Sequence, residues 1–202
     1  MATEEIKQYY DATRDSKARS DLLFSIGLVK GPKIAIDCGC GAGSDIEYLV
    51  SNGFFVHGFD VEEESISRCQ ARFKGNKNVA LSQDTFSSFS YPNASLVLAD
   101  ASLFFCPEGE FEYVWSQLYE CLDSGGIFCG SFLGADDTMA GPSYDKAAFW
   151  SDVLVFDHSE VIELFKNYEI CRFTEHKFSG KTSGGEPHHW HIFSVVARKP
   201  GE

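Results

Sequence analysis

The sequence lacks the features that would attach a protein to a membrane or direct it out of the cell. No run reaches the roughly 20 apolar residues that a membrane-spanning helix requires. The N-terminal segment MATEEIKQYYDATRD is polar and acidic, unlike a signal or transit peptide. The seven cysteines form no C-x-x-C pair, so we interpret them as reduced, buried thiols. We therefore expect a cytoplasmic protein with no membrane partner.

The sequence also has no cluster of basic residues. It contains 17 Lys and Arg against 30 Asp and Glu, which gives a formal net charge of −13. A nucleic-acid-binding protein uses clustered cations to displace counterions from phosphates. We therefore expect no nucleic-acid partner and no strongly anionic membrane surface as a partner. We expect the ligand to be a small molecule. We expect the protein to be a monomer or a homodimer.

No internal repeat, linker or low-complexity segment divides the chain. Instead, strand-length apolar runs alternate with stretches of helical periodicity. The alternation predicts five buried parallel strands at 33–38, 54–60, 79–82, 95–100 and 126–133. It predicts helices at 3–16, 20–28, 44–52, 62–74, 107–123 and 158–167, with Gly125 and Gly126 ending the fifth of these.

The C-terminal part of the sequence predicts a reversal of the chain. Segments 168–178 and 188–199 have strand patterns, and Gly184-Gly185-Glu186-Pro187 lies between them, which favours an antiparallel hairpin. Together with the preceding alternation, this indicates an α/β fold with a doubly wound sheet. Ligands of such sheets bind at the carboxyl ends of the strands, so the residues that follow each strand are the candidate site.

A glycine-rich turn follows the first strand as Asp37-Cys38-Gly39-Cys40-Gly41-Ala42-Gly43. Glycines allow a sharp turn and a close approach of the backbone to a ligand. Dinucleotide enzymes prefer G-x-G-x-x-G, which seats a pyrophosphate at the helix N-terminus, whereas here position 44 is Ser. A carboxylate at Asp37 favours a cationic ligand, and S-adenosylmethionine (AdoMet) carries a sulfonium and an ammonium group but no phosphate.

Acidic residues also follow the next strands. Asp60, beside Val61, ends the second strand and is placed to accept hydrogen bonds from both ribose hydroxyls. Asp84 follows the third strand and can accept a bond from an adenine amine, with Thr85 against the ring. Asp100 follows the fourth strand and completes the candidate cofactor-binding set.

At these positions the chain resembles the class I AdoMet-dependent methyltransferases, over about residues 33–133 and most strongly at IAIDCGCGAGSDIEYL and GFDVEEESI. More narrowly it is similar to the tellurite-resistance (TehB-like) methyltransferases and related short bacterial proteins. The shared pieces are Tyr9-Tyr10 before Arg14, LFFCPEGEF at 103–111, LDSGGIFCG at 122–130 and PHHWHIFSVVARK at 187–199.

The resemblance implies a Rossmann-like three-layer sandwich whose seven-stranded, mostly parallel sheet ends in an antiparallel hairpin strand. It implies one domain over 1–202, with an N-terminal helical cap at 1–30 and a substrate-side loop at 134–157. It also implies that Arg14 reaches the methionine carboxylate of the cofactor. The cofactor contacts that it implies are Asp37, Gly39, Gly41, Gly43, Asp60 and Asp84.

The acceptor side is less defined. Residues 100–107 lack the N-P-P-Y-type motif of enzymes that methylate amino groups of bases or glutamine, and Phe104 and Phe105 indicate a small or soft acceptor such as a thiol or a metalloid oxyanion. His189 and His191 share one face of the last strand and are candidate substrate-side residues. No ligand spacing predicts a metal site. The loop at 134–138 lacks the arginine and tryptophan common in the relatives, and Trp150 lies well beyond it, which puts tellurite in doubt.

Three alternatives to a small-molecule methyltransferase stay open. A non-catalytic AdoMet-binding sensor or partner module would carry the same cofactor loop without turnover. An NAD-dependent oxidoreductase is disfavoured by Asp37 and by Ser44 after the third glycine. A methylase of protein or RNA is disfavoured by the acidic charge and the missing motif. The sequence assigns no catalytic base, because a soft nucleophile held close to an activated methyl group needs none.

Overall fold

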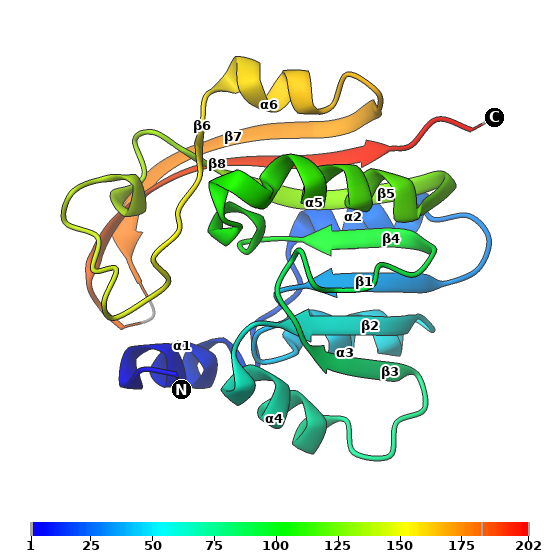
Figure 1. Ribbon diagram of the computed structural model, residues 1–202, viewed down its shortest axis with the longest axis horizontal. Coiled ribbons are helices and arrows are strands. Elements are labelled where there is room, and N and C mark those ends of the chain that lie inside the picture. Colours follow the sequence, from blue (N-terminus) through cyan, green and yellow to red (C-terminus); the bar gives the residue numbers. More distant parts are fainter. Residues whose placement is uncertain (1, 183, 202) are drawn as a thin grey trace.

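A computed structural model describes residues 2–182 and 184–201, and one twisted sheet runs through it (Figure 1). Its strands follow the order β3-β2-β1-β4-β5-β8-β7. All are parallel except β8, which runs antiparallel to both β5 and β7. The strands of this path are β1 (Ile34–Cys38), β2 (Phe55–Asp60), β3 (Val79–Gln83), β4 (Ala94–Ala99), β5 (Leu122–Gly134), β7 (Glu169–Lys181) and β8 (Pro187–Arg198).

The expected α/β fold with an antiparallel C-terminal hairpin strand is therefore confirmed. An additional two-residue strand, β6 (Val155–Phe156), pairs with β5 and was not expected from the sequence. The hairpin register brings Lys181 opposite Pro187, so the predicted turn residue Pro187 is the first residue of β8. Of the residues between these two strands, Ser183 lies outside the described part of the chain.

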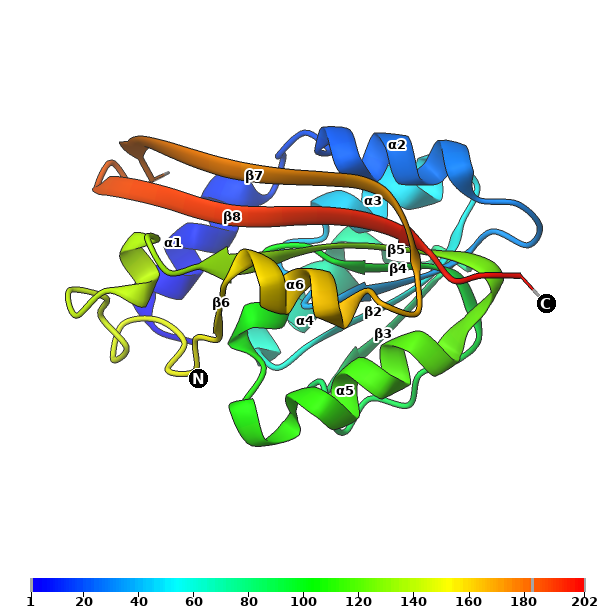
Figure 2. The same cartoon turned by 90° about the horizontal axis from the view of Figure 1, so that it is seen from above.

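Helices cover both faces of the sheet, as Figure 2 shows for α2 and α5. One core contains side chains of α2 (Ser20–Leu28), α3 (Ser44–Ser51) and α4 (Glu63–Arg72), and the opposite core contains those of α5 (Glu108–Cys121) and α6 (His158–Leu164). β4 supplies both cores, because successive strand residues point to opposite faces. Leu96 and Leu98 enter the first core, whereas Val97 and Ala99 enter the second.

The end of α5 differs from the prediction. The helix stops at Cys121 and β5 starts at Leu122, so Gly125 and Gly126 do not end the helix. The Nζ atom of Lys199 donates hydrogen bonds to the carbonyls of Tyr119 (2.9 Å) and Leu122 (2.7 Å). A lysine from the far end of the chain thus satisfies carbonyls that a helix end leaves without partners. This contact has no local sequence signal.

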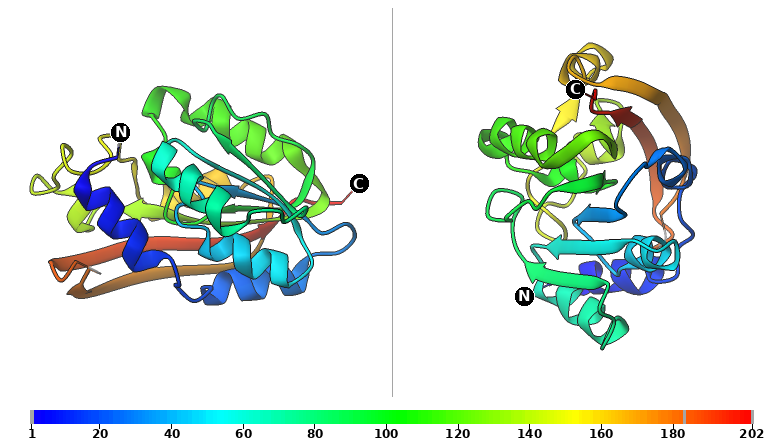
Figure 3. Two further views of the ribbon diagram at one scale, coloured as in Figure 1. Left: turned by 90° about the horizontal axis from the view of Figure 1, so that it is seen from below. Right: turned by 90° about the vertical axis from the view of Figure 1, so that its right-hand side faces the viewer.

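Two segments meet at the carboxyl ends of the parallel strands. The helix α1 (Glu4–Thr13) lies there beside the loop that follows β5, as Figures 1 and 3 show. Ile6 and Tyr10 of α1 are buried against Ala42 and the partly buried Trp150. Thr3 Oγ1, at the N-cap of α1, donates a 2.5 Å hydrogen bond to the Ala148 carbonyl. Among the described residues, no helix is long and apolar enough to cross a membrane.

Candidate functional site

A cavity of about 480 Å³ opens where these two segments face the sheet. Its walls come from the glycine turn after β1, the ends of β2, β3 and β4, the helix α1 and residues 149–152. Seven of the predicted cofactor residues line it, namely Gly39, Gly41, Asp60, Val61, Asp84, Thr85 and Asp100. The structure therefore brings together side chains from three successive crossovers at one edge of the sheet, as this topology requires.

The glycines of the turn have different roles. All three have positive φ, at +73° for Gly39, +51° for Gly41 and +79° for Gly43. A Cβ on Gly39 would lie 2.7 Å from the Ser102 Cβ, and one on Gly43 would lie 2.8 Å from the Phe73 ring. Gly43 does not line the cavity. Helix packing and the backbone conformation therefore require a glycine at this position.

Asp37 is buried beneath the glycine turn and does not line the cavity. Its Oδ2 atom has no hydrogen-bond partner among the described residues. Burial, followed by the nearby Asp45 carboxylate, raises the pKa of Asp37 well above its usual range. A buried carboxylate of this kind is stabilised in its charged form by a cation or by a hydrogen-bond donor.

Asp60 is fixed at the end of β2 by backbone donors. Its Oδ2 atom accepts a 2.9 Å bond from the Gly41 amide, and its Oδ1 atom accepts a 3.0 Å bond from the Glu62 amide. Burial raises the pKa of Asp60, and these hydrogen bonds oppose that rise. At the end of the neighbouring strand β3, Asp84 Oδ1 accepts a 2.9 Å bond from Ser88 Oγ. Two carboxylates with preset orientations thus lie along one wall.

The structure places Arg19, rather than Arg14, at the cavity. Because α1 ends at Thr13, Arg14 lies at its C-cap, exposed and away from the cavity lining. Arg19 lines the cavity, and its Nη1 atom lies 2.8 Å from Asp100 Oδ2. The prediction for Arg14 followed from family resemblance, whereas the connection between α1 and α2 decides which arginine reaches the site.

Asp45 is a cavity residue that sequence reasoning missed. It lies in the first turn of α3 and lines the cavity beside Arg19 and Asp100. Burial and the Asp100 carboxylate raise the pKa of Asp45 to about 6, while Arg19 lowers it. Its position in the turn directly after the glycine motif was the available signal.

The other end of the cavity is aromatic. Phe105 lines it, whereas Phe104 is buried and its carbonyl accepts a 2.7 Å bond from the Leu154 amide. Trp150 also lines it, with its ring 4.8 Å from Phe105 and 5.9 Å from Tyr9. The loop after β5 folds back over the sheet, so Trp150 reaches the cavity despite its distance along the sequence.

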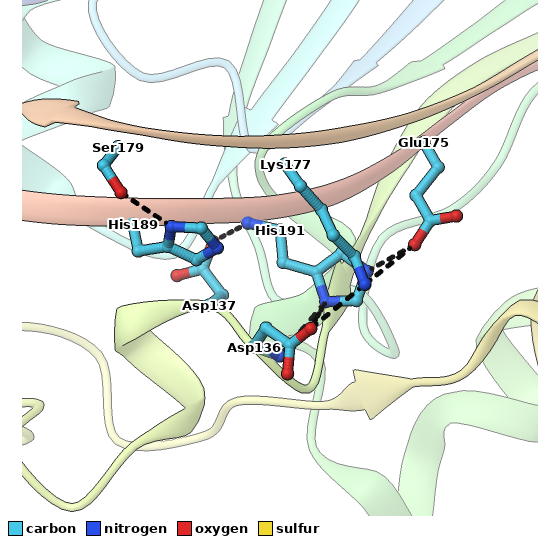
Figure 4. Close-up of polar contacts among 7 residues, drawn as sticks. All are labelled: Asp136, Asp137, Glu175, Lys177, Ser179, His189 and His191. Atoms are coloured by element: carbon cyan, nitrogen blue, oxygen red, sulfur yellow. Dashed lines mark hydrogen bonds and ion pairs between the residues drawn. The ribbon is translucent and has the colours of Figure 1, made fainter.

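His189 and His191 do not line the cavity. They lie in a polar cluster between β7, β8 and the loop after β5 (Figure 4). His191 Nδ1 accepts a 3.1 Å bond from the Asp136 amide, and its Nε2 atom lies 3.0 Å from Glu175 Oε1. His189 Nδ1 lies 2.8 Å from Ser179 Oγ. Over residues 2–182 and 184–201, no group of three His, Cys, Asp or Glu side chains is arranged to hold a metal ion.

Comparison with known proteins agrees with this geometry. Residues 35–126 match the family described as methyltransferase domain. The chain has the class I methyltransferase fold. This confirms the Rossmann-like fold that the resemblance implies.

Individual relatives are distant in sequence. A curated protein of Geobacillus sp. (strain WCH70) with a methyltransferase name is 26% identical over 102 residues, which are 48% of this chain and only 41% of the relative. TehB from Haemophilus influenzae superposes with a TM-score of 0.75 at 17% identity, covering 96% of this chain and 67% of TehB. The N-methyltransferase NodS from Bradyrhizobium japonicum WM9, in complex with S-adenosyl-L-homocysteine, has a TM-score of 0.65 at 15% identity, covering 96% and 98%.

Proposed function

We propose that this protein binds AdoMet in the cavity and catalyses transfer of its methyl group to a small molecule. The observation that carries the proposal is the row of carboxylates after β2, β3 and β4, joined by Asp45, around a glycine turn. A cofactor with a sulfonium and an ammonium group fits this charge. A pyrophosphate would be repelled by the same carboxylates. The turn also lacks the G-x-G-x-x-G spacing that places a pyrophosphate at a helix N-terminus.

Each part of the cofactor has a candidate partner in this chain. Asp60 is oriented by two backbone amides to accept bonds from the ribose hydroxyls. Asp84 is placed for the adenine amine, with Thr85 beside the ring. Arg19 is the cation available for the methionine carboxylate, a part that the family resemblance gave to Arg14. The acidic residues near the glycine turn suit the ammonium group.

The orphaned Asp37 oxygen supports the same fit. Asp37 precedes the turn at the end of β1, and its buried oxygen without a partner is a group that a cation or a hydrogen-bond donor stabilises. Bound AdoMet supplies a methyl carbon already activated by the positive sulfur. The residues of the chain then have to hold an acceptor in line with that carbon and exclude water.

The acceptor is proposed to be small, because Phe105 and Trp150 close the end of the cavity beside α1. The sequence favoured a thiol or a metalloid oxyanion. NodS is an N-methyltransferase by name, which adds nitrogen to the acceptor atoms to test.

We also propose that 1–202 works as one domain in which segment 1–30 caps the cofactor and 134–157 borders the acceptor. A cytoplasmic location, a monomeric or homodimeric state and the lack of a nucleic-acid partner remain predictions.

The proposal is tested by incubating the protein with methyl-labelled AdoMet and a panel of small thiols, amines and metalloid oxyanions. Formation of S-adenosylhomocysteine (AdoHcy) together with a labelled acceptor is the expected result. AdoMet binding without AdoHcy formation from any acceptor would instead identify a non-catalytic AdoMet-binding module. Binding of NAD in place of AdoMet would contradict the proposal.

A further inference from the structure

We infer that the acceptor is a small cationic amine, held at the aromatic end of the cavity by Glu110 and Asp152. The inference rests on the proposed function and adds the class of acceptor to it. It depends on the charge and the aromatic surface of that end and on a nearby hydroxyl without a partner.

Glu110 and Asp152 reach the cavity from two different segments. Glu110 lies in the first turn of α5, and Asp152 lies in the loop after β5. Burial raises the pKa of the Cys106 thiol to about 12, and both carboxylates add to that rise, which places them around the same point. Within the described part of the chain, neither carboxylate forms an ion pair with a Lys, Arg or His side chain.

The surfaces between these carboxylates are aromatic. Phe105 and Trp150 line the cavity with their rings tilted by 46°, and the Tyr9 ring meets Trp150 edge to face. Aromatic faces attract a cation through the ring quadrupole, more strongly where water is excluded. Two carboxylates beside aromatic rings thus match an ammonium group attached to an apolar or aromatic body.

A hydroxyl without a partner lies where the glycine turn meets the segment that carries Phe105. Ser102 lines the cavity, its residue is only 7% exposed, and its Oγ atom has no hydrogen-bond partner among the described residues. It lies at the N-cap of the 3-10 turn (Leu103–Phe105) that carries Phe105, and against Gly39 of the glycine turn. A buried hydroxyl is usually satisfied, so Ser102 is placed to bond a polar atom of a ligand.

The distribution of cations disfavours an anionic acceptor. Among the described residues that line the cavity, the basic side chains are Lys17 and Arg19, both in the connection between α1 and α2. Arg19 is already paired with Asp100. A thiolate or a metalloid oxyanion at the aromatic end would therefore face two carboxylates with no paired cation, an arrangement that costs free energy.

Methyl transfer to an amine conserves atoms and charge. The bound ammonium group loses one proton to a carboxylate of Glu110 or Asp152, and from there to water. The nitrogen lone pair forms the N–C bond to the methyl carbon while the C–S bond breaks. The electron pair of the broken C–S bond stays on sulfur, which becomes a neutral thioether. The products are a methylammonium cation, AdoHcy and one released proton.

The test is a calorimetric titration of the AdoHcy-loaded protein with three compounds that share a phenethyl group, namely phenethylamine, 3-phenylpropionate and 2-phenylethanethiol, with tellurite as a fourth ligand. We expect phenethylamine to bind at least about tenfold more tightly than the others. Glu110→Gln should weaken amine binding by about tenfold. Asp152→Asn, at an exposed residue, should weaken it by about threefold because water screens its charge.

Glu108→Gln is the matched control, because Glu108 lies in the same first turn of α5 but does not line the cavity. It should leave the amine affinity unchanged, and all three variants should keep the AdoHcy affinity of the parent. Equal or tighter binding of the carboxylate, the thiol or tellurite would overturn the inference, as would binding of none of the four or full amine affinity in Glu110→Gln. If AdoHcy itself does not bind, the proposed function fails, and the inference fails with it.

Discussion

Asp60 is the residue of the proposed cofactor site whose orientation is fixed most firmly. Its two oxygens are held by the amides of Gly41 and Glu62. We expect Asp60→Asn to weaken AdoMet binding by about ten- to hundredfold, because an amide replaces one acceptor oxygen with a donor and removes a charge. Calorimetric titration measures the effect, and circular dichroism checks that the variant folds. Unchanged affinity in a folded variant would exclude Asp60 as a cofactor ligand.

Asp45 makes both stability and cofactor affinity depend on pH. Its pKa is about 6 in the folded protein and 3.8 ordinarily. The folded state thus holds this proton more tightly than the unfolded chain. From this group, the free energy of unfolding of the ligand-free protein should fall as pH rises from about 4 to 6.

AdoMet binding should show the opposite trend. A cationic cofactor favours the ionised Asp45, so its affinity should decrease by about tenfold as pH falls from 7.5 to 5. Asp45→Asn should flatten this part of the pH profile, whereas a parent-like slope in that variant would assign it to another group. Titrations at a series of pH values provide the measurement.

At this scale the sequence predicted the residues fixed by a local motif. Gly39, Gly41, Asp60 and Asp84 line the cavity because each lies at the carboxyl end of a strand or in the turn that follows it. Arg19, Asp45 and Trp150 could not be assigned this way. Their positions depend on where α1 ends and on how a long loop folds back. No periodicity encodes either feature.

The loop after β5 is the element on which the acceptor end depends. Asp137 fixes it to β8, because its buried carboxylate accepts bonds from the amides of Met139 (2.9 Å) and His191 (2.9 Å) and lies 3.0 Å from His188 Nε2. Asp137→Ala would leave these groups without their partner. We expect a loss of about 2–4 kcal/mol in the free energy of unfolding.

Chemical denaturation measures this loss, and amide hydrogen exchange locates it. Faster exchange should be confined to the loop over 138–152, since the sheet keeps its own hydrogen bonds. Asp136→Ala is a suitable control, because Asp136 forms an exposed ion pair with Lys177 and should cost less than about 1 kcal/mol. Equal destabilisation by both substitutions would show that Asp137 does not anchor the loop.

At the scale of elements, the sequence predicted the strands better than their ends. Apolar runs identified the five strands β1 to β5, because buried parallel strands are apolar on both faces, whereas strand patterns on either side of a Gly- and Pro-containing turn identified β7 and β8. The two-residue β6 has no such run, and the end of α5 depends on Lys199, about 80 residues further along the chain. The partners of His189 and His191 also come from other elements, so their positions could not be predicted from local patterns.

The whole molecule should be stabilised by its cofactor. A ligand that binds only the folded state raises the free energy of unfolding by about 2.7 kcal/mol at 100 times its Kd. AdoMet and AdoHcy should both raise the melting temperature, and Asp60→Asn should reduce the shift at a fixed concentration. A melting temperature insensitive to both ligands would contradict a cofactor site that joins α1, the sheet and the loop after β5.

The most direct test of the account is a calorimetric titration of the unmodified protein with AdoMet, with NAD as the control ligand. The account predicts saturable AdoMet binding with a Kd on the order of micromolar, which is about −8 kcal/mol, and no heat from NAD. Clear binding of NAD without binding of AdoMet would contradict it and assign the glycine turn to a dinucleotide.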